Sequence, residues 1–317
     1  MKTQPYDFIG DIHGQHDKLT ALLDGLGYRK LDKTHRHPEG RQVIFIGDYI
    51  DRGPKVRETL HTVRGMVDAG DALAIMGNHE FNAIAYATPD GNGDYLRKHT
   101  KSNTEQHLET IQAFDKHEEE WVNWVKWMKR LPMFLDLGDL RAVHACWDAR
   151  HLEMLSGFPL LDDDFLRATA TKGKIEYTAS EILLKGPEMA LPDGMFITDK
   201  DGRMRTDVRV RWWNLEEGSN IGDLVMPEPK EELLEKVTAD MLRNLPNYGA
   251  DEPPVFFGHY WMSPTKVKQP LAANVVCLDY SGALEDNPLC AYRWDGDKDL
   301  SSGQFITANP ADRALSD

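Results

Sequence analysis

The sequence is poor in cysteine and has no long apolar run. Its three cysteines, Cys146, Cys277 and Cys290, are too few and too far apart for a disulfide framework or a paired metal-binding motif. We therefore expect buried thiols in a reducing compartment. No apolar stretch approaches the roughly 20 residues that cross a bilayer, and the N-terminus has neither the basic start nor the apolar run of a secretory signal. These absences predict a cytoplasmic protein without a membrane partner.

Basic residues are also scarce. Lys and Arg number 37 against 52 Asp and Glu, which gives a formal net charge of -15. Duplex nucleic acid is bound by basic surfaces that neutralise its phosphates, so we expect no such partner. A local basic pocket for a small phosphate is compatible with this balance. With 41% hydrophobic residues, the chain has ample material for the core of one large domain.

The first part of the chain alternates short apolar runs with amphipathic segments. This pattern is typical of strands that alternate with crossover helices in an α/β protein. Residues 6–9, 43–46 and 72–76 are predicted strands. After the first strand, leucines at helical spacing predict a helix that Gly27 closes. Similar spacing after Pro54 predicts a second helix.

Further elements are predicted in the second part of the chain. The spacing of Trp121, Trp124, Val125 and Met128 indicates one packed helix face. Short strands are expected directly before His144 and His259. Residues 275–278 and 289–294 are both apolar, and we interpret them as a hairpin-like pair.

Some acidic residues and histidines are expected to take no part in chemistry. A β-hairpin over residues 196–206 turns on an acidic segment that lacks the closing glutamate of a calcium loop, so a plain turn is expected. The run 162–164 of three aspartates indicates a solvated charge run or a helix cap. Surface positions are expected for three histidines: His99, His107 and His117.

Three motifs follow the three predicted strands. They are GDIHG at residues 10–14, GDYIDRG at 47–53 and GNHE at 77–80, and the isolated His144 and His259 each follow a later apolar run. Functional groups of open α/β sheets gather at the carboxyl ends of strands, so these side chains are expected to lie together. The glycines are expected to be structural supports: Gly10, Gly14, Gly47, Gly53 and Gly77. One motif alone is weak evidence, but their order and shared position are specific.

These motifs resemble the phosphoprotein phosphatase family of calcineurin-like metallophosphoesterases, which includes bacterial serine/threonine phosphatases and diadenosine tetraphosphate hydrolases. The resemblance runs from Asp7 to about Gly282 and is thin between residues 149 and 204. It implies an α/β fold in which two mixed β-sheets pack as a sandwich flanked by helices.

The resemblance also implies a simple domain organisation. A single metallophosphoesterase domain is expected over residues 1–295, with a helical insertion at about 86–131. A polar C-terminal tail over 296–317 is expected to fray. Whether the loop at 86–104 acts as a lid is left open at this point.

The resemblance implies two divalent metal ions. By motif, the first has three ligands, Asp11, His13 and Asp48, and the second has four, Asp48, Asn78, His144 and His259. Carboxylates and imidazoles suit manganese, the expected metal, and also iron or zinc. Such a pair shares a hydroxide and lowers the pKa of its parent water, so the bridging hydroxide is expected to attack phosphorus directly, without a phosphoenzyme.

The resemblance assigns the other catalytic roles as well. His79 is expected to protonate the leaving oxygen while Asp51 orients its imidazole. Arg52 is expected to clamp the phosphoryl oxygens, a task that suits a planar guanidinium. Arg211 is the preferred second clamp. Arg209 lies on the same side of the predicted strand, so the choice between them stays open.

Hydrolysis of phosphate monoesters, on small molecules or phosphorylated proteins, is the leading functional prediction. The alternative is a symmetrical dinucleoside polyphosphate hydrolase, acting on diadenosine tetraphosphate or a nucleoside cap. The arginine segment around Arg211 and the aromatic neighbours Trp147, Tyr260 and Trp261 favour this alternative, because aromatics can stack on a base. A non-catalytic interaction module is a third alternative, which the retained His79 argues against.

Overall fold

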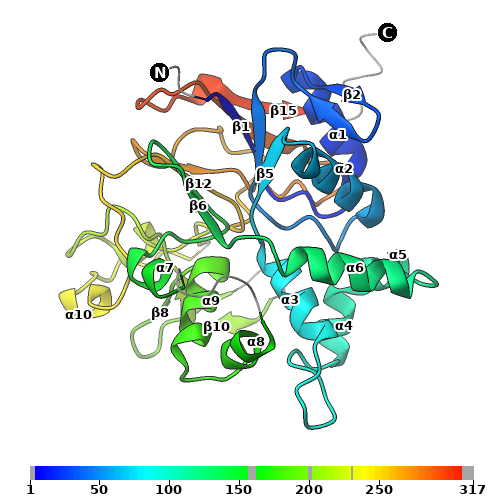
Figure 1. Cartoon of the computed structure of the whole chain (residues 1–317). Helices are drawn as coiled ribbons and strands as arrows, with labels where there is room; N and C mark the ends of the chain where they lie inside the picture. Colours follow the sequence, from blue (N-terminus) through cyan, green and yellow to red (C-terminus); the bar gives the residue numbers. More distant parts are fainter. Residues whose placement is uncertain (1–3, 156–161, 199–201, 230, 309–317) are drawn as a thin grey trace.

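The structure is a computed structural model that describes residues 4–155, 162–198, 202–229 and 231–308. Two mixed β-sheets form its centre (Figure 1). The first has five strands in the order β15 (Phe305–Ala308), β14 (Leu289–Trp294), β1 (Tyr6–Ile9), β4 (Gln42–Phe45) and β5 (Ala72–Ala74). The second has four in the order β13 (Val275–Cys277), β12 (Val255–Phe257), β7 (Arg141–Val143) and β6 (Phe134–Asp136). The predicted α/β class with two mixed sheets is confirmed.

Parallel pairing aligns the strand ends that carry the motifs. In the first sheet β1, β4 and β5 are parallel, whereas β14 runs antiparallel to both β1 and β15. In the second sheet β7, β12 and β13 are parallel, and β6 is antiparallel to β7. Each set of parallel strands therefore delivers its following loops to a single edge of its sheet.

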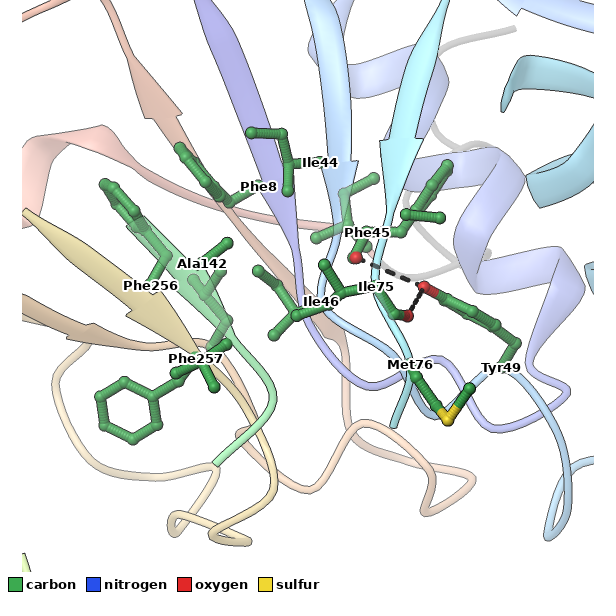
Figure 2. Close-up of a cluster of buried hydrophobic side chains, with 14 of the residues drawn as sticks. Phe8, Ile44, Phe45, Ile46, Tyr49, Ile75, Met76, Ala142, Phe256 and Phe257 are labelled. Carbon is green, nitrogen blue, oxygen red and sulfur yellow. Dashed lines mark hydrogen bonds between the residues drawn. The ribbon is translucent and has the colours of Figure 1, made fainter. Parts of the chain in front are cut away.

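Aromatic side chains join the two sheets. The rings of Phe8 on β1 and Phe256 on β12 stack with their centroids 3.7 Å apart (Figure 2). The ring of Tyr292 on β14 lies 5.4 Å from that of Phe256. All three are fully buried. Burial of one such ring stabilises the fold by roughly 1.5–3 kcal/mol relative to exposure. This shared core fixes the two sheets face to face.

Helices cover the sheets and form much of the chain that connects the strands. Those of the first part are α1 (His16–Leu26), α2 (Val56–Asp68), α3 (Asn78–Ala87), α4 (Lys101–Gln106), α5 (Leu108–Ala113) and α6 (Glu118–Met128). The predicted helices α1, α2 and α6 are confirmed, and α1 ends at Gly27 in the left-handed conformation, with φ 95°. Trp124 and Trp127 of α6 are buried and form no exposed patch.

Helix α3 was not predicted. It begins at Asn78 directly after the third motif, where Gly77 is the extended N-cap and the Glu80 carboxylate accepts the Gly77 backbone N–H at 3.0 Å. This contact is one half of a capping box, which Gly77 does not complete because it has no side chain. The motif is therefore both a helix start and a source of candidate metal ligands.

The segment between β7 and β12 has its own small core. It contains α7 (Ala149–Leu155), α8 (Asp163–Thr169), α9 (Ile175–Lys185), α10 (Ala239–Leu242), a 3-10 turn (Ile221–Asp223) and two strand pairs, β8 (Glu188–Ala190) with β11 (Asp207–Arg209) and β9 (Ile197–Thr198) with β10 (Met204–Arg205). The last pair confirms the predicted hairpin, whose turn at 199–201 lies outside the described residues. Asp162 caps α8, since its carboxylate accepts the Phe165 N–H at 2.8 Å.

The predicted pairing of residues 275–278 with 289–294 is wrong. β13 pairs with β12 in the second sheet, and β14 lies between β1 and β15 in the first. Both strands are buried on both faces, so their apolar sequences fit a hairpin equally well. The connection instead crosses from one sheet to the other.

The expected fraying after Asp295 is also not seen in residues 305–308. This segment forms edge strand β15, preceded by a 3-10 turn (Ser302–Gln304). A further strand pair, β2 (Arg29–Leu31) with β3 (Thr34–Arg36), follows α1. Among the described residues, no helix is both long and apolar enough to span a membrane.

A buried ion pair ties the N-terminal strand to its neighbours. Asp7 on β1 is fully buried, and its carboxylate accepts hydrogen bonds from Arg41, Arg293 and the Tyr28 hydroxyl at 3.0–3.4 Å. The Arg41 guanidinium also contacts Asp295 beyond β14. Two cations and a hydroxyl therefore compensate one buried carboxylate at the end of the sheet remote from the motifs.

Candidate metal centre

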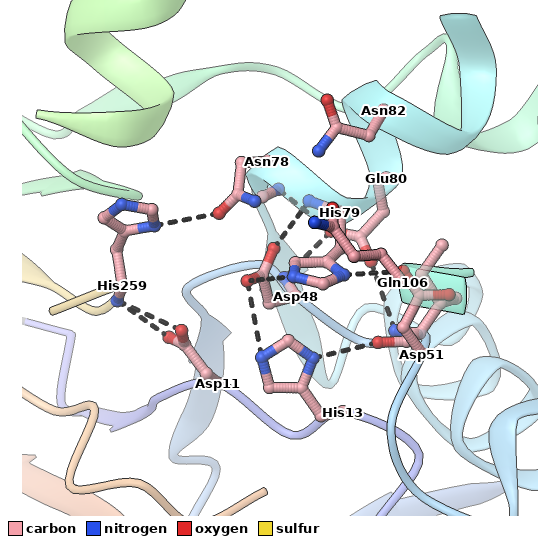
Figure 3. Close-up of polar contacts among 12 residues, drawn as sticks. Asp11, His13, Asp48, Asp51, Asn78, His79, Glu80, Asn82, Gln106 and His259 are labelled. Atoms are coloured by element: carbon pink, nitrogen blue, oxygen red, sulfur yellow. Dashed lines mark hydrogen bonds and ion pairs between the residues drawn. The ribbon is translucent and has the colours of Figure 1, made fainter. Parts of the chain in front are cut away.

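The predicted metal-binding side chains converge at the carboxyl ends of five strands. They follow β1, β4, β5, β7 and β12, and the relative exposure of each is at most 9%: Asp11, His13, Asp48, Asn78, His144 and His259. Figure 3 shows most of them facing one another. The convergence expected from the strand-end motifs is therefore present in the fold.

Asp48 is the centre of the cluster. Its Oδ2 lies 3.5 Å from His13 Nε2 and its Oδ1 lies 3.5 Å from His144 Nε2, while the His79 backbone N–H donates to Oδ1 at 2.9 Å. Two groups of side chains able to hold a metal ion share this residue. One is His13, Asp48 and His79, and the other is Asp11, Asp48 and His144, with ligand atoms within 4.8 Å of one another.

Asn78 joins the remaining histidines to this cluster. Its Oδ1 lies 3.0 Å from His144 Nε2 and 2.8 Å from His259 Nδ1. Burial opposes the charge of His144, but the charge of Asp48 outweighs it and raises the pKa of this imidazole to about 10. When the ring is neutral, as a metal ligand must be, its Nδ1–H donates to the Ile46 carbonyl at 2.8 Å and Nε2 carries a lone pair. Two acceptors, this nitrogen and the Asn78 oxygen, then face each other. A cation between them satisfies both.

The histidine tautomers also fit a metal. The His13 Nδ1–H donates to the Ile50 carbonyl at 3.0 Å, which leaves Nε2 as the acceptor. This Nε2 is buried and has no hydrogen-bond partner among the described residues. A buried polar atom left unsatisfied costs roughly 1–3 kcal/mol. The oxygen and nitrogen ligands, with Asp48 shared, fit a pair of divalent ions such as manganese, iron or zinc.

Burial and mutual charge shift the pKa values within the cluster. Burial, and then the charge of His79, lower the pKa of His13 to about 3, so its ring is neutral. Burial, followed by the charge of Asp279, raises the pKa of Asp11. Burial opposes the charge of Asp48, but the nearby imidazoles, His144 first, outweigh it and lower the pKa of that carboxyl.

The loops that carry these residues have strained backbones. Six non-glycine residues of these loops adopt positive φ between 48° and 70°: His13, Asp48, Asp51, Arg52, His259 and Trp261. Such conformations are rare for L residues and persist where the surroundings hold them. Glu80 supplies one restraint, because its fully buried carboxylate accepts the N–H groups of Asp48 and Tyr49, both at 2.8 Å.

Close backbone approach explains why two positions beside the cluster are glycine, Gly77 of the third motif and Gly258 before His259. A Cβ on Gly77 would lie 2.2 Å from both the backbone nitrogen and Oδ1 of Asp48, and one on Gly258 would lie 1.9 Å from Asp11 Oδ1. These distances are too short for any side chain. The expected supporting role of Gly77 is therefore explained, and Gly258 has the same role beside His259.

His79 and Asp51 form a hydrogen-bonded pair beside the cluster. His79 Nδ1 lies 2.5 Å from Asp51 Oδ2, and its Nε2 lies 3.9 Å from Asp48 Oδ2. Burial favours the neutral ring, but the charges of Asp48 and Asp51 outweigh it and raise the pKa of His79. The ring is thus oriented by one nitrogen and presents the other to the centre.

The surface position expected for His107 is wrong. The side chain is buried, and its Nδ1 donates to Asp51 Oδ1 at 2.7 Å, while the Thr110 hydroxyl donates to the same oxygen at 2.5 Å. Helical spacing gives no sign of this burial, because the burial follows from the packing of α4 and α5 against the loop of Asp51. His99 and His117 are exposed, as expected.

The arginines differ in their relation to the centre. Arg52 is exposed, yet its charge adds to the lowering of the His13 pKa by burial and His79, and it opposes the rise in the pKa of His79. Burial first, and then the charge of Arg209, lower the pKa of His259. Arg211 donates from Nη2 to the Asn214 carbonyl at 3.3 Å. The fold therefore brings the charge of Arg209 to the cluster.

Asp279 was not identified from the sequence. It follows β13 and is buried, and its carboxylate accepts the backbone N–H groups of Trp261 at 2.7 Å and Ser281 at 3.0 Å. Asp279 therefore holds the loop that begins at His259. The sequence did carry one indication of this residue, because Asp279 also follows a strand. Unlike the candidate ligands of the three motifs, it is not part of a motif that begins with glycine.

Comparisons with known proteins show similarity over part of the chain. A family model described as calcineurin-like phosphoesterase matches residues 5–174. Bis(5'-nucleosyl)-tetraphosphatase PrpE (asymmetrical) of Bacillus subtilis is 45% identical over 74 residues, and the protein of that name from Halalkalibacterium halodurans is 43% identical over 74 residues. Each alignment covers 23% of this chain and 30% of the relative, so less than a third of either relative is matched.

Solved structures resemble the fold at low sequence identity. A protein serine/threonine phosphatase from Saccharomyces cerevisiae has a TM-score of 0.47 and 14% identity, covering 96% of this chain and 79% of that chain. The cold-active protein-tyrosine phosphatase of a psychrophilic Shewanella species has a TM-score of 0.44 and 17% identity, covering 96% and 80%.

Proposed function

The chain belongs to the calcineurin-like phosphoesterase family, whose model matches more than half of its residues, and on that premise we propose that it hydrolyses phosphate monoesters, including phosphorylated proteins, at the centre described above. The family makes the protein a hydrolase of phosphate esters. The observation that supports the proposed site is the convergence of the shared Asp48 cluster with the His79–Asp51 pair.

We assign six side chains to two divalent metal ions, most simply manganese. Asp48 is the shared ligand of a set that comprises Asp11, His13, Asp48, Asn78, His144 and His259. When bound, such ions lower the pKa of a water to give a nucleophile and neutralise charge on the phosphoryl group. The carbonyls of Ile46 and Ile50 orient the imidazoles of His144 and His13 for this task.

His79 is the proposed proton donor to the leaving oxygen. Its Nε2 faces the centre, and Asp51 holds its Nδ1 and favours the charged ring that a proton donor needs. His107 and Thr110 in turn hold Asp51 by hydrogen bonds. Burial acts to raise the pKa of Asp51, but the hydrogen bonds of His107 and His79 outweigh it and lower that pKa. Asp51 therefore stays ionised beside the imidazolium.

Arg52 and Arg209 are the proposed clamps on the phosphoryl oxygens. We prefer Arg209 to Arg211 because its charge acts on His259, whereas Arg211 donates to a loop carbonyl. A guanidinium offers two parallel N–H donors that match the spacing of phosphoryl oxygens. The charge of Arg52 acts on His13 and that of Arg209 acts on His259, so the two arginines reach different members of the cluster.

A dinucleoside polyphosphate is the second candidate substrate. The curated relatives, which match over 74 residues, are named as bis(5'-nucleosyl)-tetraphosphatases of the asymmetrical type. A symmetrical cut of diadenosine tetraphosphate yields two ADP, whereas an asymmetrical cut yields ATP and AMP. Product identification therefore separates the two positions of cleavage.

A substrate panel tests the proposed function. Metal-free protein is reconstituted with manganese, and kcat/KM is measured for an aryl phosphate, phosphoserine and phosphotyrosine peptides, and diadenosine tetraphosphate. We expect turnover that is abolished in His13→Ala and Asp48→Asn and retained in the exposed control Asp164→Asn. Turnover that survives both substitutions would show that hydrolysis occurs elsewhere.

A further inference from the structure

A surface groove lies between α2 and α6, which run side by side (Figure 1). Its volume is about 430 Å³, which is within the range of roughly 300–1,000 Å³ that ligand sites occupy. The walls come from both helices and the turn after α6, and they are Arg64, Asn123, Lys126 and Arg130. None of these residues belongs to the candidate metal centre. The groove is therefore a separate feature of the surface.

The groove is lined by cations and an amide, with no carboxylate in its walls. This local charge runs against the balance of the chain, whose formal net charge is -15. Two guanidinium groups, one ammonium and one amide together present many N–H donors and a single acceptor oxygen. A ligand that satisfies such walls consists mainly of hydrogen-bond acceptors and carries negative charge.

Arg64 is held in place on the α2 side of the groove. Its guanidinium carbon lies 5.4 Å from the ring centroid of the buried Trp124, a contact that orients the cation over α6. Its Nε donates to Asp68 Oδ2 at 3.3 Å, but that carboxylate is largely exposed, so water weakens the pair. Its two Nη groups have no partner among the described residues. These donors remain for a ligand.

Lys126 and Arg130 are the two cations on the α6 side. Both are exposed, and in the described part of the chain neither side chain has a hydrogen-bond or ion-pair partner. Cations near the end of a helix stabilise its dipole, which accounts for their position on α6. It does not account for a third cation, Arg64, facing the same groove from α2. The like charges repel one another, and a bound anion relieves this repulsion.

The spacing of the α6 side chains fits an extended peptide. Lys126 and Arg130 are four residues apart, or about 6 Å along a helix axis. Side chains on one face of an extended peptide repeat every two residues, at roughly 6.6–6.8 Å. Two carboxylates at alternate positions of such a segment therefore meet both cations together. Arg64, on the facing helix, lies across the groove from this pair.

We propose that this groove docks an acidic segment of a partner protein, in extended conformation, with carboxylates at alternate positions against Lys126 and Arg130. Exposed charges of this kind contribute to the rate and selectivity of association more than to its strength, so the interaction is a transient one. The proposal goes beyond the proposed hydrolysis and does not depend on it, because no residue of the groove takes part in the metal centre.

Fluorescence anisotropy tests the groove directly. A fluorescein-labelled peptide of alternating glutamate and serine is titrated with the manganese-loaded wild type and with the double variant Lys126→Gln/Arg130→Gln. Each exposed ion pair is worth a factor of up to about five, so we expect the Kd of the double variant to rise about tenfold. The matched control is Lys172→Gln/Lys174→Gln, which has the same net charge and alters exposed lysines between α8 and α9. Its Kd should equal that of the wild type.

A second variant and a second peptide complete the test. Arg64→Gln should raise the Kd about threefold, and a peptide with glutamine in place of glutamate should not bind. Aryl phosphate turnover should be unchanged in all variants, which also shows that they fold. A wild type that does not bind the acidic peptide would overturn the proposal, as would equal losses in the groove variant and its control. Binding of inorganic triphosphate in the groove without binding of the peptide would identify a small-anion site instead.

Discussion

The guanidinium of Arg52 lies over the ring of Trp261, 4.4 Å from its centroid. Both residues have positive φ, 65° and 51°, and the Trp261 backbone N–H donates to the buried Asp279. The two loops, one after β4 and one after β12, thus meet through a cation and an aromatic face. This contact holds the exposed Arg52, the proposed clamp, against an aromatic side chain of a second loop.

Replacement of Trp261 by Leu should weaken catalysis through Arg52. A cation–π contact is worth about 0.5–2 kcal/mol, so kcat/KM for an aryl phosphate should fall about 2- to 30-fold. A double-mutant cycle with Arg52→Ala is the check. If Trp261 acts by orienting Arg52, its replacement should cost little further in the Arg52→Ala background. Additive losses would show that Trp261 acts independently of Arg52.

Replacement of His79 by Ala should separate substrates by their leaving groups. General acid catalysis contributes about 10²- to 10⁴-fold, and the loss should be of this order for an alkyl phosphate, whose leaving alkoxide needs a proton. With 4-nitrophenyl phosphate, whose leaving phenolate is stable, the loss should be much smaller. Manganese binding, followed by calorimetry, serves as the control for an intact centre. Equal losses on both substrates would argue against the role of His79 as an acid.

His107→Phe should act through Asp51. The substitution removes the hydrogen bond from Nδ1 to Asp51 Oδ1, so Asp51 holds the His79 ring less firmly. We expect kcat for the alkyl phosphate to fall about tenfold, from the roughly 1.5 kcal/mol of such a bond, with KM nearly unchanged. The exposed His99→Phe is the matched control, because phenylalanine keeps the ring that stacks on Tyr86. A change in KM alone would contradict a positioning role.

Metal removal should destabilise the fold. Burial concentrates Asp11, Asp48 and Asp279 around one site, and burial first, with Asp48 next, raises the pKa of Glu80 to about 7. Manganese at 100 times its dissociation constant should add about 2.7 kcal/mol to the free energy of unfolding. Thermal melting with and without EDTA measures this. In Asp48→Asn the metal-dependent shift should be largely lost, and an unchanged shift would place the metal elsewhere.

The Asp7 ion pair should matter more to stability than a surface pair of the same kind. Replacement of Arg41 by Met leaves a fully buried carboxylate with fewer partners, and we expect a loss of about 3 kcal/mol in the free energy of unfolding. The control is Arg36→Met, since Arg36 pairs with Asp71 but its side chain is 52% exposed, and its loss should be much smaller. Urea denaturation measures both, and equal losses would contradict the difference in burial.

Elements and residues whose signals lie within one segment could be predicted from the sequence. The strand Tyr6–Ile9, the helix that ends at Gly27 and the helix of the buried tryptophans all follow from periodicity and terminal residues within one segment. The six candidate ligands were also identifiable, because each lies directly after a strand, and parallel pairing delivers strand ends to one place. Their function as ligands stays a proposal.

Which distant segments come into contact could be seen only in the tertiary structure. The apolar runs at β13 and β14 look alike, and their assignment to different sheets depends on partners far along the chain, β12 and β1. Other contacts likewise join residues from separate elements. They include His107 against Asp51, Asp279 with the loop of Trp261, and the residues of the groove between α2 and α6. Local sequence reports periodicity and chain reversal, whereas these contacts depend on how complete sheets and helices pack, which no single segment encodes.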